Sequence, residues 1–198
     1  MRLYYTLPSV FARKCRIVIR EKGLLGRVEE VLTDPYVNDP PLVAANPIAQ
    51  VPALIDDDGA VFINSPIICA YLDEIGEGPR LLGTAGAEHW RIVRLAALMD
   101  GVVELAVKMT LELRRPETER SPSWITRWRE GMVRGLDAVE AAIPAGQGLD
   151  MAGLTLAAEA TWLDFRHPDF DWRTGRPKLA AVQAALEQRD SFKETRPQ

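Results

Sequence analysis

The sequence predicts an α/β domain followed by an all-helical domain. Strand-like and helix-like segments alternate in the first part of the chain, whereas every strong periodic signal after residue 86 is helical. Between the two parts, Gly76 to Gly86 contains four glycines and Pro79 with little periodicity, which is typical of a linker. We therefore expect a first domain over residues 1–76, a linker over 77–86 and a helical domain over 87–198.

The first domain is expected to begin with a strand over residues 2–6 and a helix that ends at Gly23. Ser9 stands where a helix N-cap belongs. One face of the helical segment is apolar and the others are basic. The apolar face carries Phe11, Cys15, Val18 and Ile19, and the basic residues are Arg13, Lys14, Arg16 and Arg20.

The order of elements continues with a strand over 28–32 and a polar, proline-rich stretch over 34–41, in which only a short or irregular helix is expected. Two apolar runs, 51–55 and 60–63, flank Asp58-Gly59 and indicate a hairpin. Ser65-Pro66 then predicts a helix with Ser65 as its N-cap and a stop at Gly76. The predicted order is βαβ followed by ββα.

Four helices are expected in the second part, over residues 87–114, 122–143, 155–166 and 177–189. Thr155 is the predicted cap of the third helix, and His167-Pro168 marks its end. The second helix carries a single apolar stripe. Its members are Ile125, Trp128, Met132, Leu136, Val139 and Ile143. The five tryptophans are interpreted mostly as helix-packing residues.

Composition excludes several classes of function. The 24 Lys and Arg against 28 Asp and Glu give a net charge of -4 with interspersed signs, which argues against a nucleic-acid binder. No apolar run reaches the roughly 20 residues that span a bilayer, and the first residues lack the apolar core of a signal peptide, so we expect no membrane partner. A soluble, cytoplasmic protein is the expectation.

The cysteines and histidines indicate neither a disulfide framework nor a metal. Cys15 and Cys69 fall on segments that read as buried helix faces, and no Cys-x-x-Cys pair opens the first helix, which disfavours a disulfide oxidoreductase. His89 and His167 have no ligand-spaced Cys, Asp or Glu around them and are interpreted as surface or loop residues.

Three weak signals point to one kind of ligand. Ser9, between the first strand and helix, would place a hydroxyl beside free N–H groups at a helix N-terminus, where an anion is held. Val51-Pro52, if cis, would turn the Val51 backbone outward for pairing with an extended peptide. Ser65 would receive a carboxylate at a second helix N-terminus. Each signal also has a purely structural alternative. Ser9 and Ser65 would then serve only as helix caps, and Pro52 would only begin a strand. Together the signals predict a small, extended, anionic peptide as ligand.

These segments resemble the cytosolic glutathione transferases, especially small bacterial members of the serine type. Residues 9–14 (SVFARK) are similar to the family's S-P-F-x-R-K, residues 46–54 (NPIAQVPAL) to N-P-x-G-K-V-P-x-L, and residues 64–72 (NSPIICAYL) to E/D-S-x-x-I-x-x-Y-L. Arg176-Pro177 and residues 189–197 match the closing R-P and R-x-S-F-x-x-T-x-P pattern. Four matches in order cover nearly the whole chain.

The resemblance implies a thioredoxin-like first domain with a four-stranded mixed sheet. It also implies the activity of a glutathione transferase. Ser9 would be the catalytic residue that activates the thiol of glutathione, the co-substrate, for attack on a small hydrophobic electrophile in detoxification. No other cofactor is expected. Further residues are expected to bind glutathione: Phe11, Gln50, Val51, Pro52, Asn64 and Ser65. A homodimer is also implied, in which Asp100 reaches the partner's glutathione site, and Trp162 or Phe165 would contribute to the electrophile site.

This sequence departs from the family pattern at four positions. Val10 stands where the family often has proline, and Ala158 replaces the aspartate that completes a capping box with Thr155. Gln50 replaces a lysine expected to meet the glycine carboxylate of glutathione, and Asn64 replaces an acidic residue expected to meet the α-amino group. The less charged site keeps a second hypothesis open, a non-catalytic protein of the same fold that binds glutathione or a protein partner.

Overall fold

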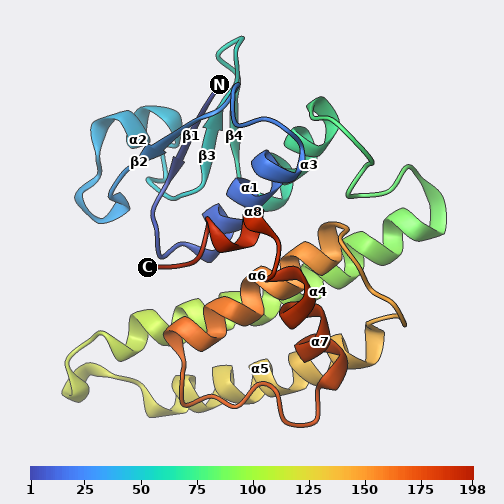
Figure 1. The fold of residues 1–198 in the computed structure, drawn as a ribbon. Coiled ribbons are helices and arrows are strands. Elements are labelled where there is room, and N and C mark those ends of the chain that lie inside the picture. Colours follow the sequence, from blue (N-terminus) through green and yellow to red (C-terminus); the bar gives the residue numbers. More distant parts are fainter. The chain divides into compact units, whose positions relative to one another are not determined.

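The computed structural model describes residues 1–198, and its chain divides into two compact units (Figure 1). Unit 1 comprises Met1–Leu82 together with Gln188–Gln198, and unit 2 comprises Gly83–Glu187. The domain limits expected from the sequence, residues 1–76 and 87–198, stay a prediction. No helix of either unit is both long enough and apolar enough to cross a membrane.

Unit 1 contains a four-stranded mixed sheet. Its strands are β1 (Arg2–Tyr5), β2 (Glu29–Leu32), β3 (Ala53–Ile55) and β4 (Val61–Ile63), in the order β2-β1-β3-β4. The strand β1 pairs in parallel with β2 and antiparallel with β3, which forms a hairpin with β4. The predicted βαβ-ββα order and the thioredoxin-like fold class are confirmed.

The helices of unit 1 cover both faces of this sheet. They are α1 (Val10–Glu21), the 3-10 turn η1 (Pro35–Val37), α2 (Pro40–Ala45), α3 (Ser65–Ile75) and α8 (Asp190–Lys193). In Figure 1 the strands lie between α2 on one side and α1 with α3 on the other. Side chains alternate along a strand, so Tyr4 and Ala53 pack against α2, whereas the neighbouring Leu3 and Leu54 are buried at the opposite face.

The two cysteines lie where α1 meets α3. Both Cys15 and Cys69 are free thiols with almost no exposed surface, and their Sγ atoms are 3.8 Å apart. The prediction that they lie on buried helix faces is confirmed.

A buried ion pair joins the end of α1 to α3. The Nζ of Lys22 lies 3.1 Å from Oδ1 of Asp73, and both side chains are at most 2 % exposed. Lys22 also donates to the Pro79 carbonyl at 2.9 Å, and Asp73 accepts from the N–H of Leu81 at 2.8 Å. The chain passes so close that a Cβ at Gly76 would lie 2.5 Å from the Cβ of Lys22. This pair therefore fixes the segment that follows α3.

The last eleven residues group with the sheet unit. Phe192, in the short helix α8, is buried, and its carbonyl oxygen accepts a hydrogen bond from the Arg13 guanidinium at 3.1 Å. The sequence pattern ends the last helix near Arg189. The structure instead ends α7 at Leu186 and begins α8 at Asp190.

Unit 2 is a bundle of four helices. They are α4 (Gly86–Leu113), α5 (Pro122–Ala142), α6 (Met151–Arg166) and α7 (Pro177–Leu186), with a 3-10 turn η2 (Glu117–Glu119) between α4 and α5. The helix α4 packs against α5 and α6, and α6 packs against α7. The apolar stripe predicted for α5 is confirmed, because its members from Met132 onward are buried and Ile125 and Trp128 are half-buried.

Two sequence predictions for unit 2 are wrong. Thr155 is no cap: α6 begins one turn earlier, because the Asp150 carboxylate accepts from the N–H of Gly153 at 2.7 Å. His167 is the expected end of α6 but no surface residue, since it is 8 % exposed. The tryptophans are mostly packing residues, as expected: Trp162 and Trp172 are buried and Trp128 is half-buried, whereas Trp90 and Trp124 are 60 % and 51 % exposed.

The His167 ring joins the end of α6 to α4. Its Nε2 lies 3.1 Å from the Ala106 carbonyl oxygen and 2.9 Å from Oγ1 of Thr110. Burial lowers the pKa of His167, and the positive charges of Arg129 and Arg166 act in the same direction, although the hydrogen bond to Ala106 opposes them. The folded protein therefore favours the neutral form of the ring.

This lowered pKa makes a prediction about acid stability. The unfolded chain binds the His167 proton more tightly than the native chain, so stability is complete above about pH 6.5 and falls as the pH drops below it. The loss is expected to reach at most about 1.4 kcal/mol per pH unit. Urea unfolding at pH 7.5 and 5.5 measures it. His167→Gln should reduce the loss, and His89→Gln, the matched control, should retain it.

Candidate functional site

The pairing of the strands brings three chain segments to one end of the sheet. Tyr4 of β1 lies opposite Ala53 of β3, which lies opposite Ile63 of β4. Because β3 is antiparallel to both neighbours, the end of β1, the start of β3 and the end of β4 lie at the same end of the sheet. The segments that continue from there carry Ser9, Val51 and Ser65. We call this region the Ser9 end of the sheet.

Ser9 caps α1 as the sequence predicts. Its backbone is extended, and its Oγ accepts a hydrogen bond from the Ala12 N–H at 3.2 Å. The side chain is partly exposed, and the hydroxyl hydrogen remains available for donation. The N–H groups of Val10 and Phe11 have no partner in unit 1, as is usual for the first turn of a helix. An acceptor or an anion bound here can therefore accept several hydrogen bonds.

The loop before β3 presents the Val51 backbone. The Val51-Pro52 peptide bond is cis, and Val51 packs beside the cluster formed by Tyr4, Leu42, Ala45 and Ala53. No hydrogen bond within unit 1 engages the N–H or the carbonyl oxygen of Val51. Both groups are thus available to an added extended chain.

Asn46 holds this loop, a role that the sequence analysis missed. Its side chain is 1 % exposed, and its Nδ2 donates to the Gln50 carbonyl oxygen at 2.8 Å. Its Oδ1 accepts from the N–H of Ile48 at 3.3 Å. Its sequence signals were the Asn46-Pro47 pair, which is typical of a turn, and its place at the start of the family-like segment 46–54. The Gln50 side chain, in contrast, is exposed and makes no hydrogen bond within the unit.

Ala49 adopts a left-handed backbone conformation in the same loop, with φ of 50°. This region disfavours a residue with a Cβ by roughly 1–2 kcal/mol, so Ala49→Gly should raise the free energy of unfolding by about 1 kcal/mol. Urea denaturation measures the change. The matched control is Ala44→Gly in α2, which should lower stability by about 0.5–1 kcal/mol because glycine weakens a helix. Destabilisation by both variants would contradict the prediction.

The N-cap of α3 is Asn64, so the prediction of Ser65 as the cap is wrong. Asn64 has φ of 74°, and its carbonyl oxygen accepts from the N–H of Ile68 at 3.0 Å, which begins the helix one residue earlier than expected. The Asn64 side chain is exposed and makes no cap hydrogen bond. Ser65 occupies the first helical position with 4 % of its surface exposed. Asn64 and Ser65 thus stand together at the helix N-terminus.

Phe11 follows Ser9 by two residues and is partly exposed. The Nζ of Lys14 lies 5.9 Å from the centre of its ring, and its carbonyl oxygen lies 3.6 Å from the Cys15 Sγ. A contact between Phe11 and a ligand stays a prediction.

The remaining predicted site residues belong to unit 2. Asp100 lies midway along α4 and is half-buried. Trp162 is 3 % exposed in α6, with its ring edge-on to His167. Phe165, almost one turn further along α6, is 37 % exposed, and the Arg166 guanidinium covers its ring at 4.4 Å. Their expected roles stay predictions.

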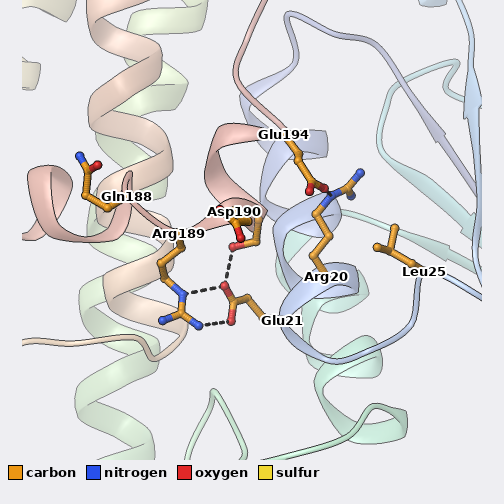
Figure 2. A pocket seen from close by; sticks show the side chains of 8 residues that line it. Arg20, Glu21, Leu25, Gln188, Arg189, Asp190 and Glu194 are labelled. Atoms are coloured by element: carbon orange, nitrogen blue, oxygen red, sulfur yellow. Dashed lines mark hydrogen bonds and ion pairs between the residues drawn. The ribbon is translucent and has the colours of Figure 1, made fainter.

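A pocket of about 470 Å³ lies at the other end of α1 (Figure 2). Its lining residues are mostly paired: Glu21 binds the Arg189 guanidinium at 2.7 Å and Ser191, and Arg20 binds Glu194 at 3.0 Å. Partial burial alone would raise the pKa of Glu21, but the hydrogen bonds from Arg189 and Ser191 lower it. The pocket thus belongs to the attachment of α8, roughly 18 Å along the helix from Ser9.

Comparisons with known proteins identify both parts of the chain. Residues 3–80 match the model of the glutathione S-transferase N-terminal domain, and residues 122–182 match that of the C-terminal domain. A GST-like protein of Escherichia coli K12 named YibF, described as uncharacterized, is 30 % identical over 201 residues, which cover 100 % of this chain and 98 % of that protein. A maleylacetoacetate isomerase from Pseudomonas aeruginosa is 32 % identical over 150 residues, covering 72 % of this chain and 69 % of the isomerase.

A solved structure agrees with these matches. The crystal structure of a glutathione transferase family member from Pseudomonas fluorescens Pf-5, with bound glutathione, is 33 % identical, covers 100 % of this chain and 98 % of its own, and superposes with a TM-score of 0.89. The similarity spans both units, and three of the segments that carry the sequence resemblance, with Ser9, Val51 and Ser65, meet at the Ser9 end of the sheet. The chain belongs to the glutathione S-transferase family.

Proposed function

We propose that this protein is a glutathione transferase that activates the thiol of glutathione through Ser9. The observation that carries the proposal is the Ser9 end of the sheet, where a hydroxyl with a free hydrogen, two helix N-termini and an unpaired backbone segment come together. A similar protein holds glutathione in its crystal structure, which supports this ligand class for the site.

The proposed placement of glutathione follows the chemistry of each group. The cysteinyl backbone pairs with the N–H and carbonyl oxygen of Val51, as an added strand would. The γ-glutamyl carboxylate meets Ser65 and the positive end of the α3 dipole. Asn64 faces the α-amino group, Gln50 the glycine carboxylate, and the sulfur lies at Ser9, with Phe11 beside it.

The proposed chemistry depends on stabilising a thiolate. A free thiol of pKa near 8.5 is only about 3 % ionised at pH 7, whereas a pKa lower by two units makes it about three-quarters ionised. Ser9 cannot act as the base, because a hydroxyl is far less acidic than a thiol. It donates a hydrogen bond to the sulfur anion, and the unpaired N–H groups and dipole of α1 add to the effect.

The activated sulfur then attacks an electrophilic carbon. A carbon–sulfur bond forms from a thiolate electron pair, and the leaving group departs with the electron pair of the bond that breaks. Holding both reactants together supplies much of the rate gain. We assign Trp162 or Phe165 to the electrophile site, and detoxification of small hydrophobic electrophiles to the protein. The isomerase among its relatives shows that this family also includes proteins named for a different reaction.

A non-catalytic member of the family that binds glutathione or a protein partner is the second candidate. It is favoured by the neutral side chains of Gln50 and Asn64, which replace charged residues of the family pattern and are both exposed.

The proposed assembly is a homodimer in the cytoplasm. Support for the dimer comes from Val61, Ile63 and Ile67 on β4 and α3, which are 48 %, 38 % and 56 % exposed although apolar. Asp100 would then reach the partner's glutathione. Free Cys15 and Cys69 suit the reducing cytoplasm. The mass of the protein in solution tests the dimer, since a monomer at micromolar concentration would refute it.

Calorimetric titration with reduced glutathione, followed by assays with a panel of electrophiles, tests the function. Binding with turnover supports the transferase. Binding without turnover of any electrophile supports the second candidate. The absence of glutathione binding rejects the transferase and leaves only the protein-partner form of the second candidate.

A further inference from the structure

The two cysteines of the chain are in contact between the helices that carry the proposed glutathione site. Cys15 belongs to α1 and Cys69 to α3, and these helices pack against each other on one face of the sheet (Figure 1). Their Sγ atoms are 3.8 Å apart, and neither residue has more than 1 % of its surface exposed. The fold thus brings together two thiols that lie 54 positions apart in the sequence.

Each thiol lies one helical turn from a residue of the proposed site. The Sγ of Cys15 is 3.6 Å from the carbonyl oxygen of Phe11 and 4.0 Å from that of Ser65, across the helix contact. Cys69 follows Ser65 by four residues, which is about 6 Å along α3. The thiol pair therefore touches the first turns of both helices at whose N-termini glutathione is proposed to bind.

We infer that Cys15 and Cys69 form a reversible disulfide with a small hydroperoxide as the oxidant, and that this bond weakens the binding of glutathione. In the first step one sulfur attacks the peroxide: an S–O bond forms, the O–O bond breaks, and hydrogen peroxide leaves as water. The second thiol then attacks that sulfur. An S–S bond forms, the S–O bond breaks, and the hydroxyl leaves as a second water with the thiol proton. The two sulfur atoms lose two electrons, which the peroxide gains.

Contact between the two sulfur atoms determines the product. A sulfenic acid on either residue has the other thiol beside it, so the disulfide forms before further oxidation. A mixed disulfide with glutathione would need space for a tripeptide, and a sulfur atom buried to this extent does not offer it. Burial also slows the reaction with any oxidant, so the pair responds to sustained rather than brief exposure to peroxide.

Closing the bond must displace the first turns of α1 and α3. A disulfide bond is about 2.05 Å long, so the two sulfur atoms must approach each other by about 1.7 Å. The surrounding core is close-packed, so the helices share in this movement. The thiol hydrogen that Cys15 directs at the carbonyl oxygens of Phe11 and Ser65 is also lost.

The effect on the ligand rests on the proposed function, in which one glutathione molecule spans both helix N-termini. Its sulfur lies at Ser9 before α1, and its γ-glutamyl carboxylate lies at Ser65 in α3. A ligand that fits the reduced protein therefore fits the oxidised protein less well.

Peroxide treatment of the full chain, followed by intact-mass measurement and peptide mapping, tests the bond. After hydrogen peroxide is removed, the protein should have lost the mass of two hydrogen atoms. The loss should map to linked peptides that contain Cys15 and Cys69, and dithiothreitol should reverse it. Cysteines that stay reduced, or that gain oxygen atoms without a link, overturn the inference.

Calorimetric titration with S-methylglutathione measures the effect on the site, because this thioether cannot reduce a disulfide. The oxidised protein should bind it about tenfold more weakly than the reduced protein, since a small misplacement of binding groups has a large effect. Equal affinities in the two states overturn the inference alone. Failure of the reduced protein to bind either S-methylglutathione or glutathione rejects the proposed function as well.

Cys69→Ala is the matched control, and Cys15→Ala repeats it from the other helix. Each variant keeps one thiol and cannot form the bond, so its affinity should equal that of the reduced wild type before and after peroxide. Both variants retain every methionine, which peroxide also oxidises. If peroxide weakens binding equally in the variants and in the wild type, the effect does not come from the disulfide and the inference is wrong.

Discussion

Replacing Ser9 with alanine is expected to lower the rate of glutathione conjugation about 20- to 100-fold at pH 7 while unit 1 remains folded. The hydroxyl is the group at the start of α1 that has a hydrogen to donate to a sulfur anion. Without it the pKa of bound glutathione should rise toward that of the free thiol, and a rise of two units alone reduces the thiolate at pH 7 from about three-quarters to about 3 %.

Titration of thiolate absorbance in the complex measures this pKa directly. The lost cap should cost about 1 kcal/mol of stability, which unfolding measures separately. Ser9→Thr is the control, since threonine retains a hydroxyl and should keep the lowered pKa. An unchanged pKa in Ser9→Ala would remove Ser9 from the mechanism.

Replacing Asp73 with asparagine should destabilise the protein by about 3–5 kcal/mol. The substitution leaves the Lys22 ammonium buried, 2 % exposed, without its counter-charge. It also weakens two hydrogen bonds, because the carboxylate oxygens accept from the N–H groups of Leu81 and Leu82 at 2.8 Å and 3.0 Å. Urea unfolding, followed by fluorescence and circular dichroism, measures the change.

The double variant Lys22→Met with Asp73→Leu tests the same cause. Removing both charges removes the uncompensated ammonium, so the double variant should be more stable than Asp73→Asn. Asp190→Asn is the matched control: Asp190 pairs with Lys193 at 3.6 Å but is 90 % exposed, and its loss should cost less than about 1 kcal/mol. A similar small loss at Asp73 would contradict the role of the buried pair.

Local patterns were sufficient for the order of elements because each has a short-range cause. The Asp-Gly turn specified the β3–β4 hairpin, and the period of apolar residues specified α5, since side chains three and four residues apart share one face of a helix. Ser9 was found as a cap for the same reason: its hydroxyl reaches the Ala12 N–H within one turn.

Prediction failed where a distant residue decides the outcome. Thr155 is a reasonable cap by type, but Asp150 begins α6 earlier and is held by Arg91 of α4 at 2.7 Å. His167 was interpreted as a surface or loop residue, and its burial was missed because its partners, Ala106 and Thr110, lie about 60 positions earlier in the chain. The α3 cap was missed for a local reason, since its position depended on the left-handed backbone of Asn64, which residue type alone does not specify.

The sequence by itself determined the element order and the family motifs, because these are properties of neighbouring residues. Only the tertiary structure placed Ser9, Val51 and Ser65 at one end of the sheet, buried Lys22 against Asp73, and assigned Asn46 to the loop before β3. Strand register and burial join residues far apart in the chain, and such contacts leave no periodic signal in the residues that make them.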